Sequence, residues 1–288
     1  MSEAKAQVSE AKAQGGEAKA VVVRMEEGIA WVSLNRPEKR NAINPAIVFE
    51  MNEVLDRLEM DDACRVVVIT GSGEAFSAGQ DLKEYFREPD AGHPVLRERL
   101  HKANAAWQWR RLMHFSKPTI AMVNGWCFGG AFQFLLACDL AIADEKAVFG
   151  LSEINWGIIP AGIVTKSVAM AVLQRQALYY IMTGETFDGK RAEEIGIVNF
   201  AVPKDQLEAR VRKLAQTLMQ KNPHVLRACK QGYHYVRDLP WDMAAEYLAA
   251  KSDQTKFRDP EQGDQKGMKQ FLDDKSYRPG LGAYNRDK

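Results

Sequence analysis

The sequence is poor in cysteine and has no long apolar run. Its four cysteines lie far apart and form no CxxC pair: Cys64, Cys127, Cys138 and Cys229. They are too few for a disulfide framework, so we expect small buried residues in a reducing compartment. A membrane helix needs about eighteen consecutive apolar residues, and the chain contains neither such a run nor an apolar signal segment. These absences predict a cytoplasmic protein that does not cross a membrane.

A charge excess of either sign is also absent. Lysine and arginine total 39 against 38 aspartate and glutamate residues, so the formal net charge is +1. A broad surface for nucleic acid or another polyanion would need a clear basic excess. The balance predicts no nucleic-acid partner, although it leaves room for a local basic patch.

Motifs of the common enzyme classes are missing as well. The chain has no GxSxG, no GxxxxGK[ST], no HExxH, and no GxGxxG after a strand. Its histidines, at 93, 101, 114, 224 and 234, show no metal-binding spacing. We therefore expect no metal and no separate cofactor. A mechanism would have to use carboxylates and backbone N–H donors.

The first twenty residues contain a seven-residue repeat of Glu, Ala and Lys. These residues favour a helix, but a coiled coil needs two apolar residues in each heptad. The only large apolar residue of the repeat is Val8. We interpret residues 1–20 as a disordered tail; a functional helical arm is the alternative.

Residues 21–203 show the pattern of an α/β domain. Val21–Val23 and Ile29–Leu34 flank a turn and predict a β-hairpin. Asn44 is expected to cap a helix that begins at Pro45. That helix has one apolar stripe, formed by Ile47, Val48, Met51, Val54, Leu55 and Leu58.

Short apolar strands and helices then follow in turn. The wholly apolar strand at 65–70 is typical of a sheet covered by helices on both faces. A strand at 119–123, a helix at 129–138, and strands at 139–143 and 147–150 repeat the pattern. Residues 204–288 are expected to form a helical region, with helices at 206–221, 223–236 and 241–258.

Two glycine segments could supply backbone donors. Gly79 precedes Asp81, which can cap a helix over 82–87, and Gly129 and Gly130 open the helix of 129–138. Backbone N–H groups at a helix N-terminus point outward with a partial positive charge. Glycine lets an anionic oxygen approach closely. The two segments together suggest two amides that meet over one oxyanion.

The same segments carry a resemblance to a known family. The sequences LNRPEKRNA (34–42), FSAGQDL (76–82), KPTIAMVNGWCFGG (117–130) and FGLSEINWGIIP (149–160) resemble the crotonase (enoyl-CoA hydratase/isomerase) superfamily in order and spacing. The resemblance covers about residues 21–275. It implies an α/β fold made of a spiral of ββα turns with a helical C-terminal trimerisation region. Homotrimers, or dimers of trimers, are expected.

Within the superfamily, DLKEYFR (81–87) and GMKQFLDDK (267–275) are similar to the hydroxycinnamoyl-CoA hydratase-lyases. This likeness implies an acyl-CoA hydratase-lyase that hydrates feruloyl- or p-coumaroyl-CoA and cleaves the adduct to an aromatic aldehyde and acetyl-CoA. The alternatives are an enoyl-CoA isomerase and a simple enoyl-CoA hydratase. A non-catalytic assembly or RNA-binding member is disfavoured by the charge balance.

The resemblance also implies roles for single residues. The amides of Gln80 and Gly130 would form the oxyanion hole, in which the side chain of Gln80 need not matter. Glu153 would be the acid/base for both hydration and cleavage, although a surface or capping glutamate is the alternative. Gln133 stands where ordinary hydratases carry a first glutamate, and an amide cannot act as a general base.

Further residues are expected to bind the substrate. Tyr85 matches a tyrosine that contacts the phenol, whereas the position of a second such tyrosine is Ala249 here. Tyr247, two positions away on a helix, would face elsewhere. Trp156 could wall the acyl pocket or be a core residue. The candidate CoA-binding residues are Lys39, Arg40 and Ala78, and the two basic ones could instead be solvated.

Overall fold

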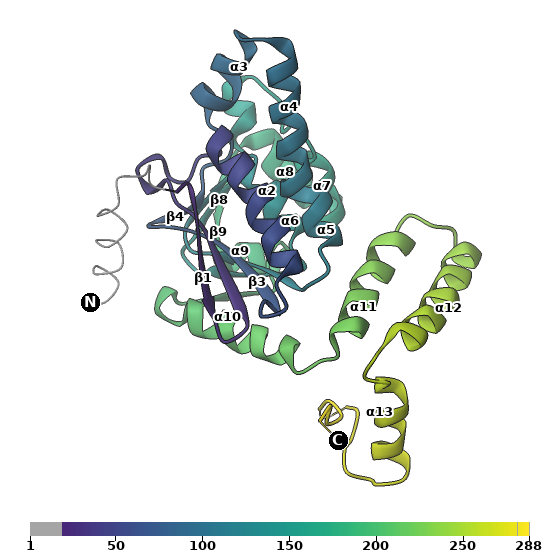
Figure 1. The fold of residues 1–288 in the computed structure, drawn as a ribbon. Coiled ribbons are helices and arrows are strands. Elements are labelled where there is room, and N and C mark those ends of the chain that lie inside the picture. The colour runs from purple at the N-terminus through teal and green to yellow at the C-terminus, as the bar shows by residue number, and fades with distance from the viewer. Residues whose placement is uncertain (1–18, 281, 288) are drawn as a thin grey trace.

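The computed structural model describes residues 19–280 and 282–287, so almost all of the expected N-terminal tail lies outside the described residues. Two sheets form the body (Figure 1). One has the order β1-β2-β3-β5-β7-β10, and the other has the order β4-β6-β8-β9. The strands are Val21–Glu26 (β1), Ile29–Leu34 (β2), Val66–Gly71 (β3), Ala75–Ser77 (β4), Thr119–Val123 (β5), Trp126–Phe128 (β6), Leu140–Asp144 (β7), Val148–Gly150 (β8), Thr186–Asp188 (β9) and Phe200–Val202 (β10).

Apolar residues on alternate positions of the large sheet face opposite ways. Val67 and Ile69 of β3 belong to the main core, whereas Val66 and Val68 belong to a second core on the other face. Helix α10 (Lys204–Met219) covers that second face with Leu207, Val211 and Ala215. The prediction of a sheet covered on both faces, and with it the α/β class, is confirmed.

Helix α2 (Pro45–Met60) forms as the sequence predicts. The Asn44 side chain accepts a hydrogen bond from Ile47 N at 3.1 Å, and Pro45 occupies the first turn. The predicted stripe is buried in full: Ile47, Val48, Met51, Val54, Leu55 and Leu58. The hairpin of β1 and β2 is confirmed too, with Val21 opposite Leu34.

Several helices between the strands differ from the expected pattern. The segment after Asp81 is a π-helix, η2 (Leu82–Arg87), capped by the Asp81 side chain. A second π-helix, η3 (Ala106–Arg111), follows α4 and lies in a region for which the sequence predicted no element. The remaining helices up to β10 are η1 (Pro37–Lys39), α3 (Glu88–Asp90), α4 (Pro94–Ala105), α5 (Leu112–His114), α6 (Ala131–Ala137), η4 (Ser152–Trp156), α7 (Val164–Ala171), α8 (Gln174–Thr183) and α9 (Gly189–Glu194).

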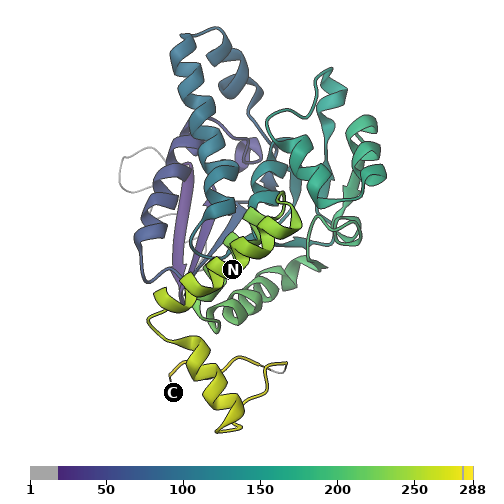
Figure 2. The ribbon, with the colours of Figure 1, turned by 90° about the vertical axis from the view of Figure 1, so that its right-hand side faces the viewer.

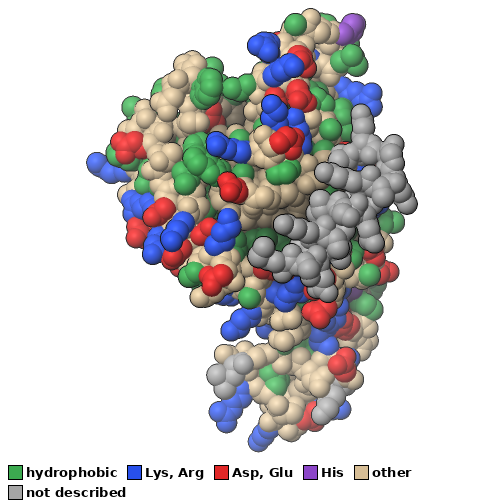
Figure 3. All heavy atoms as spheres, turned by 90° about the vertical axis from the view of Figure 1, so that its left-hand side faces the viewer, with side chains coloured by type: hydrophobic (Ala, Val, Ile, Leu, Met, Phe, Trp, Pro, Cys, Tyr) green, Lys and Arg blue, Asp and Glu red, His purple; other side chains and the backbone are tan. Residues whose placement is uncertain are grey.

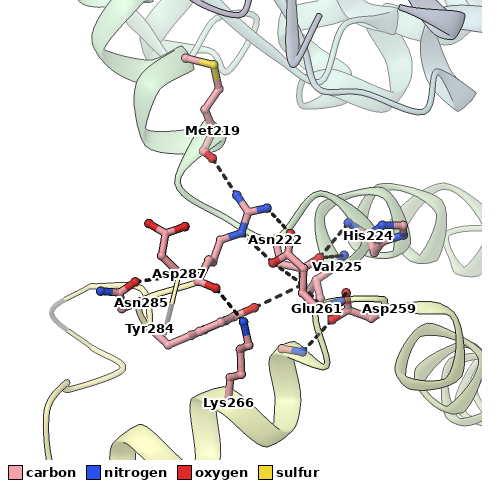
Figure 4. Close-up of polar contacts among 12 residues, drawn as sticks. Met219, Asn222, His224, Val225, Asp259, Glu261, Lys266, Tyr284, Asn285 and Asp287 are labelled. Carbon is pink, nitrogen blue, oxygen red and sulfur yellow. Dashed lines mark hydrogen bonds and ion pairs between the residues drawn. The ribbon is translucent and has the colours of Figure 1, made fainter. Parts of the chain in front are cut away.

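Three C-terminal helices project from the body (Figures 1 and 2). These are α11 (Pro223–Val236), α12 (Trp241–Arg258) and α13 (Gly263–Leu272). A group of polar side chains, the C-terminal cluster, fixes their junction (Figure 4). Its members are Asn222, Asp259, Glu261, Tyr284 and Arg286.

Surface charge and cysteine burial agree only in part with the sequence-based expectations. Basic and acidic side chains lie interspersed on the face in Figure 3, and no helix among the described residues is long and apolar enough to span a membrane. Cys64 and Cys127 are buried as expected. The prediction is wrong for Cys229, which is exposed because it lies on α11, outside the main core.

Candidate active site

Three neighbouring strands bring the candidate residues to one edge of the small sheet. Strands β4, β6 and β8 pair in parallel, with Phe128 opposite Gly150. Gln80, Gly130 and Glu153 each follow one of these strands within three residues. Because parallel strands end at a common edge, residues far apart in sequence meet there.

The two glycine segments are in contact. A Cβ atom on Gly79 would lie 2.7 Å from the Phe128 carbonyl oxygen and 3.0 Å from the Gly130 nitrogen, and Gly79 has a φ of +84°. Only glycine fits this approach and this backbone conformation. Neither the Gln80 N–H nor the Gly130 N–H donates a hydrogen bond to another residue within 19–280 and 282–287. The structure thus brings two unused amides together.

Glu153 lies beside the second glycine segment. Its Oε1 is 3.1 Å from the position that a Cβ on Gly129 would take. Its Oε2 is buried without a hydrogen-bond partner among the described residues. Burial raises the pKa of Glu153 above its usual value, against a smaller opposing effect of its own backbone amide. A carboxyl group in this setting is suited to accept and return protons.

Gln133 and Tyr85 are both buried. Gln133 is buried on α6, and its Oε1 lies 3.0 Å from the position of a Cβ on Gly162. Tyr85, on η2, is only 5% exposed, and its ring stacks on His101 with centroids 5.2 Å apart. Burial raises the pKa of Tyr85 to about 12, so its hydroxyl is protonated at neutral pH.

The other candidate aromatic positions lie partly or fully exposed in the single chain. Trp156 is 65% exposed, so the alternative that it is a core residue is wrong; it is the last residue of η4, the 3₁₀ turn that also carries Glu153. Ala249 lies exposed on α12, away from the body (Figure 1). Tyr247 packs against Tyr235 of α11, with ring centroids 5.7 Å apart.

The candidate CoA-binding residues lie in and beside the first glycine segment. Lys39, Arg40 and Ala78 are all exposed, and Ala78 N donates to the Arg40 carbonyl at 2.9 Å. The Arg40 guanidinium lies 4.8 Å above the ring of Trp126. These residues therefore lie next to one another at the edge that carries Gln80.

Arg36, to which the sequence alone assigned no role, joins the loop after β2 to the segment that follows Gln80. The Arg36 side chain donates to the Ala42 carbonyl at 2.8 Å, and pairs with Asp81 at 3.2 Å and Glu84 at 2.8 Å. Asn44 donates to the second oxygen of Glu84 at 2.8 Å. This network holds the loop of Gln80 in place; its signal in the sequence was the position of Arg36 inside segment 34–42, which carries the family resemblance.

A cavity of about 750 Å³ lies elsewhere, between α11 and the core. Its lining includes none of Gln80, Gly130 and Glu153. Lys230 in its wall is already paired with Asp139 at 2.9 Å. This cavity is not the site of the candidate chemistry.

Comparison with known proteins identifies the family. The family described as enoyl-CoA hydratase/isomerase matches residues 24–278. The chain belongs to that family. An enoyl-CoA hydratase subunit I from Geobacillus kaustophilus shares its fold, with a TM-score of 0.80 and 29% identity over 91% of this chain and 98% of that one. The crotonase fold is confirmed.

Individual family members differ in how close they are to this chain. A hydroxycinnamoyl-CoA hydratase-lyase from Pseudomonas fluorescens is 56% identical over 266 residues, which is 92% of this chain and 96% of the relative. A mevalonyl-coenzyme A hydratase from Aspergillus fumigatus is 37% identical over 218 residues, 75% of this chain and 77% of the relative.

Proposed function

We propose that this protein is a hydroxycinnamoyl-CoA hydratase-lyase. It hydrates an aromatic enoyl-CoA such as feruloyl- or p-coumaroyl-CoA and cleaves the adduct to an aromatic aldehyde and acetyl-CoA. The proposal is carried by one half-buried carboxylate, Glu153, whose Oε2 is buried without a partner among the described residues and which lies next to loops with unused amides. The 56% identity to a hydroxycinnamoyl-CoA hydratase-lyase supports this choice within the family.

The amides of Gln80 and Gly130 hold the thioester oxygen. When a nucleophile adds to the β-carbon, the electron pair of the double bond moves toward this oxygen and forms an enolate. A pre-oriented donor in such a hole is worth about 3–4 kcal/mol of transition-state stabilisation. Neither amide donates a hydrogen bond to another described residue, so no such bond has to break before the amides bind the anion.

Glu153 transfers the protons of both steps. As a carboxylate it takes a proton from water while the oxygen adds to the β-carbon, and it then returns that proton to the α-carbon. For cleavage it takes the proton of the new β-hydroxyl. The Cα–Cβ bond breaks, the carbonyl of the aldehyde forms, and the electron pair becomes the acetyl-CoA enolate, which Glu153 protonates.

The remaining side chains bind the substrate. Tyr85, Gln133 and Trp156 surround the acyl group, and Lys39, Arg40 and Ala78 meet the CoA. Coenzyme A enters as part of the substrate, so the proposed chemistry uses no other cofactor. With glutamine at 133, Glu153 is the single general base.

We also propose that the chain forms a homotrimer or a dimer of trimers. Helix α12 has no buried residue in the single chain, although it carries Trp241, which is 92% exposed, and Phe257, which is 91% exposed. Apolar side chains in such numbers are normally covered by another protein surface. Light scattering would measure the mass; a monomer would contradict the assembly.

The test of the function is product analysis with feruloyl-CoA. The expected products are vanillin, detected by its absorbance, and acetyl-CoA in equal amounts. A product that retains all carbon atoms would contradict cleavage: a β-hydroxyacyl-CoA would indicate a simple hydratase. A shifted double bond in a non-aromatic enoyl-CoA would indicate an isomerase, which also needs only one glutamate.

A further inference from the structure

Buried polar atoms without partners gather in one segment of the chain. Seven buried side-chain nitrogen or oxygen atoms lack a hydrogen-bond partner among the described residues. One of them belongs to Glu153, and four lie on α4 and η3: His101 Nε2, Asn104 Oδ1, Trp107 Nε1 and Gln108 Nε2. Buried polar groups in proteins are nearly always hydrogen-bonded. Their concentration beside the catalytic edge indicates a place for a polar ligand group.

Asn104 and Gln108 form the centre of this segment. They are one helical turn apart, and Asn104 is 5% and Gln108 0% exposed. Asn104 Nδ2 donates to Gln108 Oε1 at 2.8 Å, and Gln80 Nε2 donates to the same oxygen at 3.1 Å. Two donors that converge on Oε1 fix the orientation of the Gln108 amide. We call Gln80, Asn104 and Gln108 the amide cluster.

The amide cluster leaves one acceptor and one donor unused. Asn104 Oδ1 can accept a hydrogen bond, and Gln108 Nε2 can donate one. The two groups lie on neighbouring side chains that are already joined by a hydrogen bond. A hydroxyl group, which both donates and accepts, matches this pair.

The amide cluster connects the two ends of the candidate site. The Gln80 side chain fills the space beside Gly130, where a Cβ would lie 1.4 Å from Gln80 Oε1. At the other end, Asn104 lies close enough to the Tyr85 hydroxyl to oppose, in part, the rise in the pKa of Tyr85 that burial causes. Tyr85 and Gln108 both lie on π-helices, which occur frequently at functional sites.

We propose that Asn104 and Gln108 bind the ring hydroxyl of the substrate. The hydroxyl donates to Asn104 Oδ1, and its oxygen accepts from Gln108 Nε2, next to Tyr85. This inference rests on the proposed function, because it needs a hydroxylated ring in the acyl pocket. Asn104 and Gln108 would then be the second polar partner of the ring hydroxyl, after Tyr85. They would replace the second tyrosine that the resemblance implies, since position 249 is alanine here.

The test measures binding rather than turnover. Full-length Glu153→Gln is the parent, and its Kd is determined for p-coumaroyl-CoA and for cinnamoyl-CoA, which lacks the hydroxyl. Adding Gln108→Met is expected to lower the preference for the hydroxylated ester by roughly three- to tenfold. The ratio of the two Kd values cancels any effect on the oxyanion hole that both esters share. Arg110→Gln, on the exposed side of η3, is the matched control and should leave the ratio unchanged.

A third ester tests the same pair without a further substitution in the cluster. 4-Methoxycinnamoyl-CoA can accept a hydrogen bond but cannot donate to Asn104. The parent should bind it no more tightly than cinnamoyl-CoA. Equal affinity for the methoxy and hydroxy esters would overturn the role of Asn104, even if Gln108→Met did not fold.

The outcomes separate this inference from the proposed function. If the unmodified enzyme releases aldehyde, but Gln108→Met keeps the preference and Tyr85→Phe loses it, the inference is overturned and the function stands. If the unmodified enzyme releases no aldehyde, the function fails. The inference then stands only if the parent prefers the hydroxylated ester and Gln108→Met removes that preference; no preference overturns it.

Discussion

The C-terminal cluster and the amide cluster differ in how fully their buried polar atoms are hydrogen-bonded. In the C-terminal cluster, Asn222 Oδ1 accepts from His224 N and Val225 N, and its Nδ2 donates to Asp259 at 2.8 Å and to Tyr284 at 3.2 Å. In the amide cluster, the unused atoms of Asn104 and Gln108 remain. Asn222 and Asn104 are similarly buried, but Asn222 uses its hydrogen bonds to stabilise the fold, whereas Asn104 keeps an acceptor that no described residue uses, free for a ligand.

Two carboxylates, Asp259 of the C-terminal cluster and Glu153 of the candidate active site, show the same contrast. For Asp259, burial raises the pKa, but hydrogen bonds from Gly263 and Asn222 outweigh it and lower the pKa overall. For Glu153, burial raises the pKa and little opposes it. A carboxylate with satisfied oxygens fixes a structure, whereas one with an unpartnered oxygen can exchange a proton with a ligand.

The largest effect is expected at the unpartnered carboxylate. Glu153→Gln keeps the shape of the side chain but cannot take up a proton. Turnover of feruloyl-CoA should fall at least about a thousandfold, because both steps need the same base. CoA-ester affinity, measured by calorimetry, should stay within a few-fold. A rate above a few per cent of the wild type would remove Glu153 from the mechanism.

The pH dependence follows from the direction of the Glu153 shift. The base must be deprotonated, and its raised pKa means that protonation begins at a higher pH than for an ordinary glutamate. As the pH falls through this pKa, kcat/KM should decrease about tenfold per pH unit. A pH–rate profile with no acid limb above the usual glutamate range would contradict the shift.

A smaller but still large effect is expected at Gly130. Gly130 has a φ of −58°, which proline can adopt, so Gly130→Pro removes the N–H without forcing the backbone. We expect kcat to fall about 10²–10³-fold. Gly130→Ala is the matched control, because it also displaces the Gln80 side chain but keeps the N–H. Equal losses in the two variants would argue against the backbone donor.

Asn222→Ala should change stability rather than specificity. It removes the cap of α11 and leaves Asp259 short of a buried donor, which costs about 2–4 kcal/mol. The unfolding temperature, compared at equal protein concentration, should fall by several degrees. The ratio of kcat/KM for p-coumaroyl-CoA over cinnamoyl-CoA should not change. A changed ratio would contradict the view that the C-terminal cluster stabilises the fold without affecting substrate selectivity.

The sequence predicted the regular parts of the fold well. The stripe of α2 and the apolar runs of β2 and β3 are strong patterns, and both are confirmed. Strands β4 and β6 were missed because each has only three residues and follows a glycine-containing turn closely. Helix α4 was missed because Leu100 and Asn104 are its only buried residues, so it has no apolar stripe.

The candidate site was predictable only where glycines and the family resemblance mark it. The sequence placed Gln80, Gly130 and Glu153 together, and the structure brings their loops to one edge. The expectation that the Gln80 side chain need not matter did not include its hydrogen bond to Gln108. Polar residues such as Asn104 and Gln108 suggest a solvated surface in a sequence. Their burial is a tertiary property.

The smallest predicted effect concerns the residue that adjoins the amide cluster. Tyr85→Phe removes one hydroxyl, which lies next to the Asn104 side chain and is expected to contact the ring hydroxyl of the substrate. A buried hydrogen bond contributes about 0.5–1.5 kcal/mol, and more is lost if its partner is stranded. We therefore expect kcat/KM for p-coumaroyl- or feruloyl-CoA to fall roughly three- to thirtyfold.

The control for Tyr85→Phe is the unhydroxylated substrate. Cinnamoyl-CoA has no ring hydroxyl to bind, so its kcat/KM should barely change. The stacking of residue 85 on His101 survives because phenylalanine keeps the ring. If both substrates lose rate equally, Tyr85 supports the fold of η2 rather than the ring hydroxyl. If the wild type also turns over crotonyl-CoA as fast as feruloyl-CoA, the aromatic substrate class is wrong, while membership of the enoyl-CoA hydratase/isomerase family is unaffected.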